Sequence, residues 1–179
     1  MKYSLVVGVA GGIGSGKTEF AHQLASAMHA SFLSFGDYVR RRATTLGMDL
    51  SRDNLQALGE RLISEMGWDE FVGDVLLSWS RSEPLILDGI RHEKAVESIK
   101  KLVAPANFSL VYLSVDKTIR VGRLSTVRPH DAIAIERLEQ HSTERDVHSK
   151  LSDLADIVLD GSRAVPTLVQ DALEALHLS

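Results

Sequence analysis

A glycine-rich segment near the N-terminus limits the possible folds of this chain more than any other stretch, and it reads Gly11-Gly12-Ile13-Gly14-Ser15-Gly16-Lys17-Thr18. The spacing fits the phosphate-binding loop pattern, in which a glycine is followed by four residues and then by Gly-Lys-Ser/Thr. Glycines permit positive φ angles, so successive backbone N–H groups can converge on phosphate oxygens. Lys17 would reach the β- and γ-phosphates of a nucleoside triphosphate, and the Thr18 hydroxyl would ligate Mg²⁺. The segment therefore predicts ATP and Mg²⁺ as cofactors.

The residues on either side supply the strand–loop–helix order that this motif requires. Ser4–Ala10 is an apolar, valine-rich run that is typical of a buried parallel strand. From Glu19 to Ala30, apolar residues recur at helical spacing. A flexible glycine turn with a chance lysine would not need these neighbours, so we interpret the segment as a phosphate-binding loop.

Short apolar runs alternate with helical stretches along the chain, which indicates an α/β fold around a parallel sheet. Residues 36–82 hold helices with no strand between them, and an insertion there would overhang the carboxyl ends of the strands. We therefore predict a single domain with a core of residues 1–35 and 83–179 and a helical insertion of residues 36–82. The expected strands are Leu5–Ala10, Ser31–Phe35, Leu85–Asp88, Phe108–Val115 and Asp156–Leu159.

Composition narrows the possible partners and location. The 179 residues carry a formal net charge of −4, which argues against binding to nucleic acid polymers. The chain has no cysteine, which excludes disulfides and fits a reducing cytoplasm. No apolar run approaches the roughly 20 residues of a membrane span, and the first strand follows the N-terminus so closely that we expect no signal peptide. We expect a cytoplasmic monomer or homodimer that acts on a small molecule.

Several charged residues are candidates for the site. Asp88 ends an apolar strand, as the second metal-site acid of P-loop proteins does, although it could instead cap the following helix. Arg123 and Arg128 flank a short connection and could bring positive charge to a transferring phosphoryl group. For Arg120, a functional role and a solvated helix face are balanced alternatives. The histidines are scattered, and we interpret His141 and His148 as surface residues.

Two segments resemble the nucleoside-monophosphate kinase group of small P-loop kinases. Gly36-Asp37-Tyr38-Val39-Arg40 is similar to the Thr-Gly-Asp-x-x-Arg segment of adenylate kinases, although Phe35 stands where that family has a small residue. Leu87-Asp88-Gly89-Ile90-Arg91 resembles their Asp-Gly-Phe-Pro-Arg segment with one residue missing. The resemblance implies that Arg40 and Arg91 hold the phosphate of the acceptor.

The phosphate-binding loop and the C-terminal third are more similar to dephospho-coenzyme A kinase. The similarity rests on Gly-Gly-Ile-Gly-Ser-Gly-Lys, on the pair Arg123 and Arg128, and on Ala155-Asp156 before the last strand. It implies that the two arginines belong to a short lid around residues 124–132 and that adenine lies near Arg123 and Gly161. The similarity to nucleoside-monophosphate kinases implies in turn that the insertion of residues 36–82 binds the acceptor. Together the resemblances imply a three-layer P-loop kinase fold, whose five-stranded parallel sheet has the order 2-3-1-4-5.

These features favour an ATP-dependent kinase that transfers the γ-phosphoryl group to a nucleoside monophosphate or a similar nucleotide. Lys17, Arg123 and Arg128 would neutralise the transferring group. One alternative is transfer to a ribose hydroxyl, as in dephospho-coenzyme A kinase, for which Asp37 would serve as the base. A second alternative is a P-loop ATPase that acts as a nucleotide-dependent binding module. In the monophosphate interpretation, Asp37 only organises the start of its helix.

Overall fold

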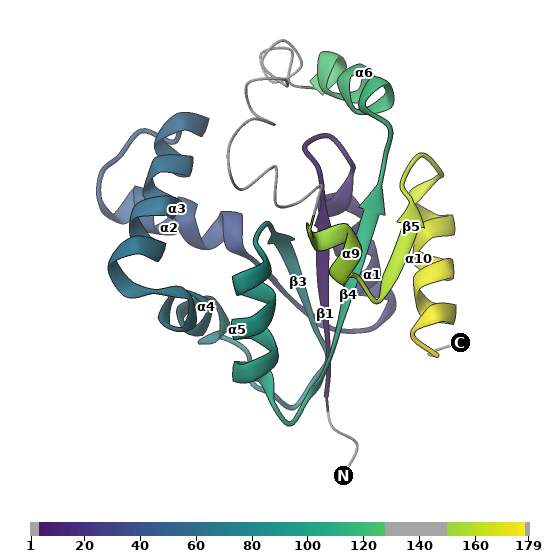
Figure 1. The fold of residues 1–179 in the computed structure, drawn as a ribbon, viewed down its shortest axis with the longest axis horizontal. Coiled ribbons are helices and arrows are strands. Elements are labelled where there is room, and N and C mark those ends of the chain that lie inside the picture. The colour runs from purple at the N-terminus through teal and green to yellow at the C-terminus, as the bar shows by residue number, and fades with distance from the viewer. Residues whose placement is uncertain (1–3, 128–149, 178–179) are drawn as a thin grey trace.

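The computed structural model describes residues 4–127 and 150–177, which contain a five-stranded parallel sheet with the strand order β2-β3-β1-β4-β5 (Figure 1). The strands are β1 (Leu5–Gly11), β2 (Ser31–Ser34), β3 (Leu85–Ile90), β4 (Asn107–Ser114) and β5 (Ile157–Asp160). The helices are α1 (Lys17–Ala27), α2 (Phe35–Thr45), α3 (Arg52–Met66), α4 (Trp68–Leu76), α5 (Glu93–Val103), α6 (Lys117–Val127), α9 (Ser152–Leu154) and α10 (Val165–Ala175). The predicted fold class and strand order are confirmed.

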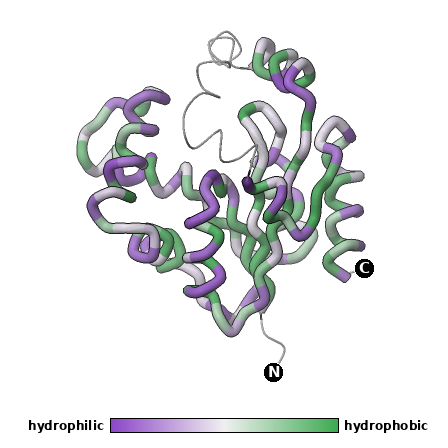
Figure 2. The backbone as a smooth tube through the Cα atoms, viewed as in Figure 1, coloured by the Kyte–Doolittle hydropathy of each residue, from purple (hydrophilic) through white to green (hydrophobic). Residues whose placement is uncertain are grey.

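Both faces of the sheet are buried, which explains why its strands are almost continuously apolar. Successive side chains point to opposite faces, so Val6 joins the core under α2 to α5 whereas Val7 joins the core under α1 and α10. The central strands are accordingly largely green, the colour of hydrophobic residues, in Figure 2. The molecule therefore has three layers, with α1 and α10 on one face of the sheet and α2 to α5 on the other.

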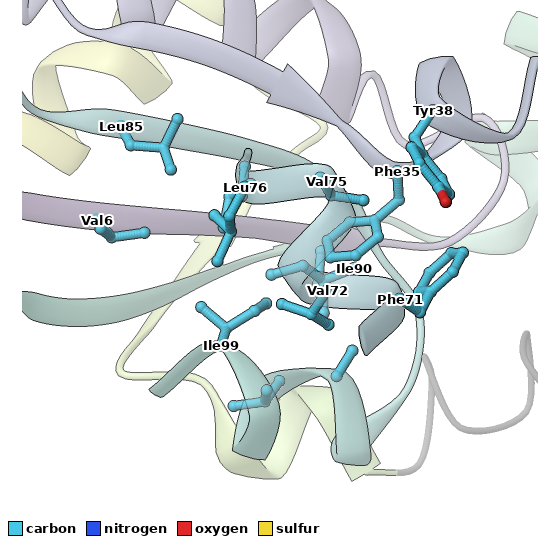
Figure 3. Packing of buried hydrophobic residues seen from close by; sticks show 14 of the residues in the cluster. Val6, Phe35, Tyr38, Phe71, Val72, Val75, Leu76, Leu85, Ile90 and Ile99 are labelled. Carbon is cyan, nitrogen blue, oxygen red and sulfur yellow. The ribbon is translucent and has the colours of Figure 1, made fainter. Parts of the chain in front are cut away.

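The helices α2, α3 and α4 lie between β2 and β3 in sequence, as the helix-rich stretch predicts. Aromatic residues join α4 to α2: the ring of Phe71 stacks on Phe35 at 5.8 Å and meets the edge of Tyr38 at 5.4 Å, measured between ring centroids. Figure 3 shows these rings at one end of the larger core cluster, with Val6 and Leu85 at the other. The insertion is thus continuous with the core.

Several element boundaries differ from the expected ones because local contacts decide them. We expected Phe35 to end a strand, but it begins α2, because the Ser34 hydroxyl caps that helix by accepting a hydrogen bond from the Asp37 N–H at 3.4 Å. The N-cap of α5 is His92, whose Nδ1 accepts from the Lys94 N–H at 3.1 Å, and not Asp88. The helix expected over Asp131–Val147 lies outside the described residues.

Within the described ranges, none of the helices combines the length and the apolar character that crossing a membrane would require. The strand arrows in Figure 1 point toward the top of the view, so the carboxyl ends of the parallel strands lie there, with α6 above them. In open α/β sheets ligands bind at this edge.

Candidate active site

The phosphate-binding loop connects β1 to α1 at the carboxyl edge of the sheet. Its conformation requires glycine at two positions: Gly16 caps α1 with φ 83°, and Gly14 has φ 79°. A Cβ at Gly14 would also lie 2.9 Å from the carbonyl oxygen of Arg120. The loop therefore leads into the N–H groups of the first turn of α1, which together with the helix dipole favour a bound phosphate.

Lys17 and Thr18 begin α1 and lie beside the acid that ends β3. The Lys17 side chain is only 9% exposed, and its Nζ donates to the carbonyl of Gly12 at 3.3 Å. Thr18 Oγ1 donates a hydrogen bond to Asp88 Oδ2 at 2.9 Å. Because β3 pairs directly with β1, the acid predicted from the sequence reaches the phosphate-binding loop across neighbouring strands.

Two buried polar atoms at this point lack hydrogen-bond partners within the described part of the chain, namely Asp88 Oδ1 and Ser15 Oγ. Asp88 is 4% exposed, and an orphaned carboxylate oxygen at that depth is costly unless a ligand or an ion satisfies it. A hydroxyl beside a carboxylate is also the oxygen donor set that Mg²⁺ prefers, since it is usually held by one or two protein oxygens and by phosphates. The residues present fit a Mg²⁺ ion, which Thr18 and Asp88 would hold.

Two arginines of α6 support the phosphate-binding loop from behind. The guanidinium of Arg120, 4% exposed, donates to the carbonyls of Ile13 and Val115, both at 3.1 Å. Arg123 donates to the carbonyl of Ser15 at 3.2 Å and to that of Gly161 at 2.9 Å. The structure therefore connects Arg123 to Gly161, the two residues expected near adenine, whereas Arg128 lies outside the described residues.

The sequence alone left Arg120 undecided, and its burial against the loop makes it a site residue. One signal was available: Arg120 and Arg123 are three residues apart, which places them on one helix face. The decisive contacts join residues more than 100 positions apart, so no local pattern reveals them.

Carboxylates also organise the two loops next to this site. Hydrogen bonds from the hydroxyl and the N–H of Ser162 hold the pKa of Asp160 below its usual value, and they shape the loop that contains Gly161. The pKa of Asp116 is likewise lowered. The main cause is the hydrogen bond that its Oδ1 accepts from the Thr118 N–H at the start of α6. Asp116 thereby caps α6.

The predicted acceptor residues lie on the other side of Asp88. Ser34 pairs with Asp88 in the sheet, so α2 begins beside Asp88. Within α2, Asp37 Oδ1 accepts a hydrogen bond from Arg40 Nη1 at 2.6 Å, and both side chains are about half exposed. This contact orients the guanidinium of Arg40.

A cavity of about 460 Å³ opens between α2, α3, α4 and the loop after β3. This volume lies within the range of small-molecule pockets. The lining brings together the predicted residues Arg40 and Arg91, and it does not include Asp37. The other lining residues that matter here are three aromatic side chains and four polar ones, namely Phe35, Trp68, Phe71, Arg52, Gln56, Glu60 and His92. We call this cavity the acceptor pocket.

The fold is shared with solved kinase structures at low sequence identity. An APS kinase of Mycobacterium tuberculosis, in complex with AMPPNP and APS, matches with a TM-score of 0.67 and 16% identity over 99% of both chains. A shikimate kinase of Aquifex aeolicus matches with a TM-score of 0.63 and 19% identity over 96% of both chains. A gluconokinase of Sinorhizobium meliloti gives 0.62 and 17% over 99% of this chain and 94% of that one. These similarities establish the P-loop kinase fold.

Similar sequences carry the name UPF0200 protein. The one from Thermococcus gammatolerans is 26% identical over 131 residues, which cover 71% of this chain and 68% of the relative. The one from Methanothrix thermoacetophila is 28% identical over 120 residues, which cover 67% and 64%. The chain therefore spans about two thirds of the length of these relatives. A family model described as an AAA domain matches residues 7–146, from β1 past α6, and this chain belongs to that family of P-loop proteins.

Proposed function

We propose that this chain is an ATP-dependent kinase that transfers the γ-phosphoryl group of ATP–Mg²⁺ to a nucleoside monophosphate or a similar nucleotide. One observation carries the proposal: a cationic pocket begins at the residue that follows the metal-site acid. Asp88 accepts from Thr18, and the next residue, Gly89, already lines the acceptor pocket together with Arg40 and Arg91. The phosphate-binding loop and a pocket for a second anion therefore adjoin each other next to Asp88.

Phosphoryl transfer depends mainly on positioning and on neutralising charge. Lys17 and the N–H groups of the loop would bind the β- and γ-phosphates, and Mg²⁺ on Thr18 and Asp88 would supply further positive charge. Arg40 and Arg91 would hold the acceptor phosphate in line, as forked guanidinium groups do for phosphates. An acceptor oxygen then attacks the γ-phosphorus, the bond to the β–γ bridging oxygen breaks, and ADP leaves. Arg123 and Arg128 keep their proposed role of neutralising the transferring group.

The contact of Asp37 supports this choice over a hydroxyl acceptor. A monophosphate attacks through an oxygen that is already ionised, so no general base is needed, whereas a hydroxyl benefits from one. Asp37 is engaged with Arg40 at 2.6 Å and stands outside the pocket lining, which suits an orienting role. A nucleotide-dependent binding module would have no use for a pocket with three arginines beside its phosphates.

The test is a panel of acceptors incubated with labelled ATP–Mg²⁺: the common ribo- and deoxyribonucleoside monophosphates, and hydroxyl acceptors such as nucleosides and dephospho-coenzyme A. We expect label in a nucleoside diphosphate, and a modest fall of kcat in Asp37→Asn. If label appears only on a hydroxyl, and Asp37→Asn lowers kcat about 10²–10⁴-fold with a flattened pH profile, Asp37 is a base and the hydroxyl alternative is correct. Hydrolysis of ATP with no labelled acceptor would support the binding module.

A further inference from the structure

The wall of the acceptor pocket formed by α3 presents two rows of residues at a spacing of four. One row is Leu55, Gly59 and Ile63, and the other is Arg52, Gln56 and Glu60; all six line the pocket. Side chains four residues apart lie above one another on a helix. The pocket therefore has an apolar strip next to a polar strip, the latter running from a cation through an amide to a carboxylate.

Glu60 also lines the acceptor pocket, and its negative charge is unfavourable for binding a phosphate. Three arginines, Arg40, Arg52 and Arg91, line the same cavity and would draw an acceptor phosphate towards them. A carboxylate facing that phosphate would repel it, so Glu60 suits a different part of the ligand, one that carries hydrogen-bond donors. The Glu60 side chain also makes no hydrogen bond or ion pair with another residue in ranges 4–127 and 150–177.

The aromatic side chains suggest that this other part is a flat ring. Phe35, Trp68 and Phe71 line the pocket, and stacking on such rings stabilises any base. The hydrogen-bonding edge then decides which base is bound. The two oxygens of a carboxylate match two adjacent N–H donors, which guanine offers at N1 and N2, whereas adenine and cytosine pair one donor with an acceptor.

Resting on the proposed function, we propose that the acceptor is a guanine nucleotide, whose base is recognised by Glu60 and Gln56. Glu60 accepts from the N1–H and the N2 amino group, and the side-chain amide of Gln56, one helical turn away, donates to O6. Arg40 and Arg91 hold the phosphate at the end of the pocket next to Asp88. Glu60 and Gln56 are thus residues that determine specificity by contacting the base and not the reacting atoms.

The experiment compares GMP, IMP and AMP as acceptors and, separately, as ligands in calorimetry without ATP. IMP differs from GMP only in lacking the N2 amino group, which removes one charge-assisted hydrogen bond, so we expect about 10–100-fold lower kcat/KM and affinity. Glu60→Gln replaces one acceptor oxygen by a donor, and we expect GMP to lose about 100-fold while the AMP-to-GMP ratio rises. The matched control is Glu65→Gln, on the same helix but paired with Arg61 on the surface and outside the pocket lining.

The outcomes separate this inference from the proposed function. Wild-type preference for AMP over GMP, unchanged in Glu60→Gln, would overturn guanine recognition and leave the kinase intact. Preferential binding of GMP that depends on Glu60, without phosphoryl transfer to any monophosphate, would support guanine recognition and overturn the kinase. Equal losses in Glu60→Gln and Glu65→Gln would show a general effect on α3 and would count against the inference.

Discussion

Among single residues, Arg120 shows how a buried charged side chain can hold a loop in place by hydrogen bonds to its backbone. Its guanidinium reaches the carbonyl of Val115 through Nε and that of Ile13 through Nη1, and so ties α6 to the phosphate-binding loop. A buried charge must be hydrogen-bonded, and a planar fork with donors on separate nitrogens does this at two carbonyls at once. Holding Ile13 keeps the loop in the conformation that accepts phosphate.

We predict that Arg120→Lys weakens catalysis more than it weakens the fold. Lysine keeps the charge but cannot bridge both carbonyls, and a lost hydrogen bond to a charged group is worth about 1.5–3 kcal/mol. We therefore expect kcat/KM for ATP to fall about 10–100-fold, measured with protein shown to be folded by circular dichroism. Arg61→Lys is the control, because Arg61 forms a surface ion pair with Glu65 at 3.7 Å and should be nearly neutral. A large loss of stability with normal kinetics of the folded enzyme would make Arg120 a structural residue only.

Among the helices, α4 is joined to α2 and to α5 by hydrogen bonds. The hydroxyl of Tyr38 on α2 donates to Asp74 Oδ2 at 2.7 Å, and Ser98 on α5 donates to Asp69 Oδ1 at 2.6 Å. Lys101 forms an ion pair with the same aspartate. Because α4 carries Trp68 and Phe71, these contacts hold the aromatic wall of the acceptor pocket against the core.

Tyr38, which is buried and hydrogen-bonded to Asp74, makes the stability of the folded chain depend on pH in the alkaline range. Burial, and then the hydrogen bond to Asp74, raises the pKa of Tyr38 from 10.0 to about 12. The folded state therefore holds this proton more tightly than the unfolded state, so the stabilisation is complete below about pH 10 and is lost as the pH rises towards 12.

We predict that Tyr38→Phe removes this pH dependence and lowers stability near neutral pH by about 1–3 kcal/mol, since Asp74 loses a partner. Urea unfolding between pH 8 and pH 11 would measure it, and wild type should lose stability more steeply above pH 10 than the variant. The other titrating groups are common to both proteins, so the difference isolates Tyr38. Parallel curves for the two proteins would contradict the assignment.

For the molecule as a whole, periodicity and motifs predicted the layers and the loop, whereas contacts between distant segments decided the rest. Apolar runs such as Leu85–Leu87 identify strands because a parallel sheet buries both faces. No pattern predicts that Arg120 is buried against Ile13 or that Gln56 and Glu60 face the pocket, since both depend on how α6 and α3 pack. The resemblance to nucleoside-monophosphate kinases led to Arg40 and Arg91, which the fold places in one cavity.

The last prediction concerns the stability of the whole molecule, because a ligand that binds only the folded state stabilises all of it. At about 100 times its Kd, ATP–Mg²⁺ should add about 2.7 kcal/mol, which for a chain of this size raises Tm by roughly 5–10 °C. Thermal unfolding with ATP–Mg²⁺ and with ATP plus EDTA separates the contribution of the nucleotide to the Tm shift from that of the metal. In Asp88→Asn the Tm should shift equally with the two additions, because the Mg²⁺-dependent part of the shift requires the Asp88 carboxylate. In Lys17→Ala the Tm should shift with neither. Each shift is measured against the same variant without ligand, so any change that a substitution itself makes in Tm cancels. A full Mg²⁺-dependent shift in Asp88→Asn would mean that the ion binds elsewhere, and the orphaned Asp88 Oδ1 would then need another explanation.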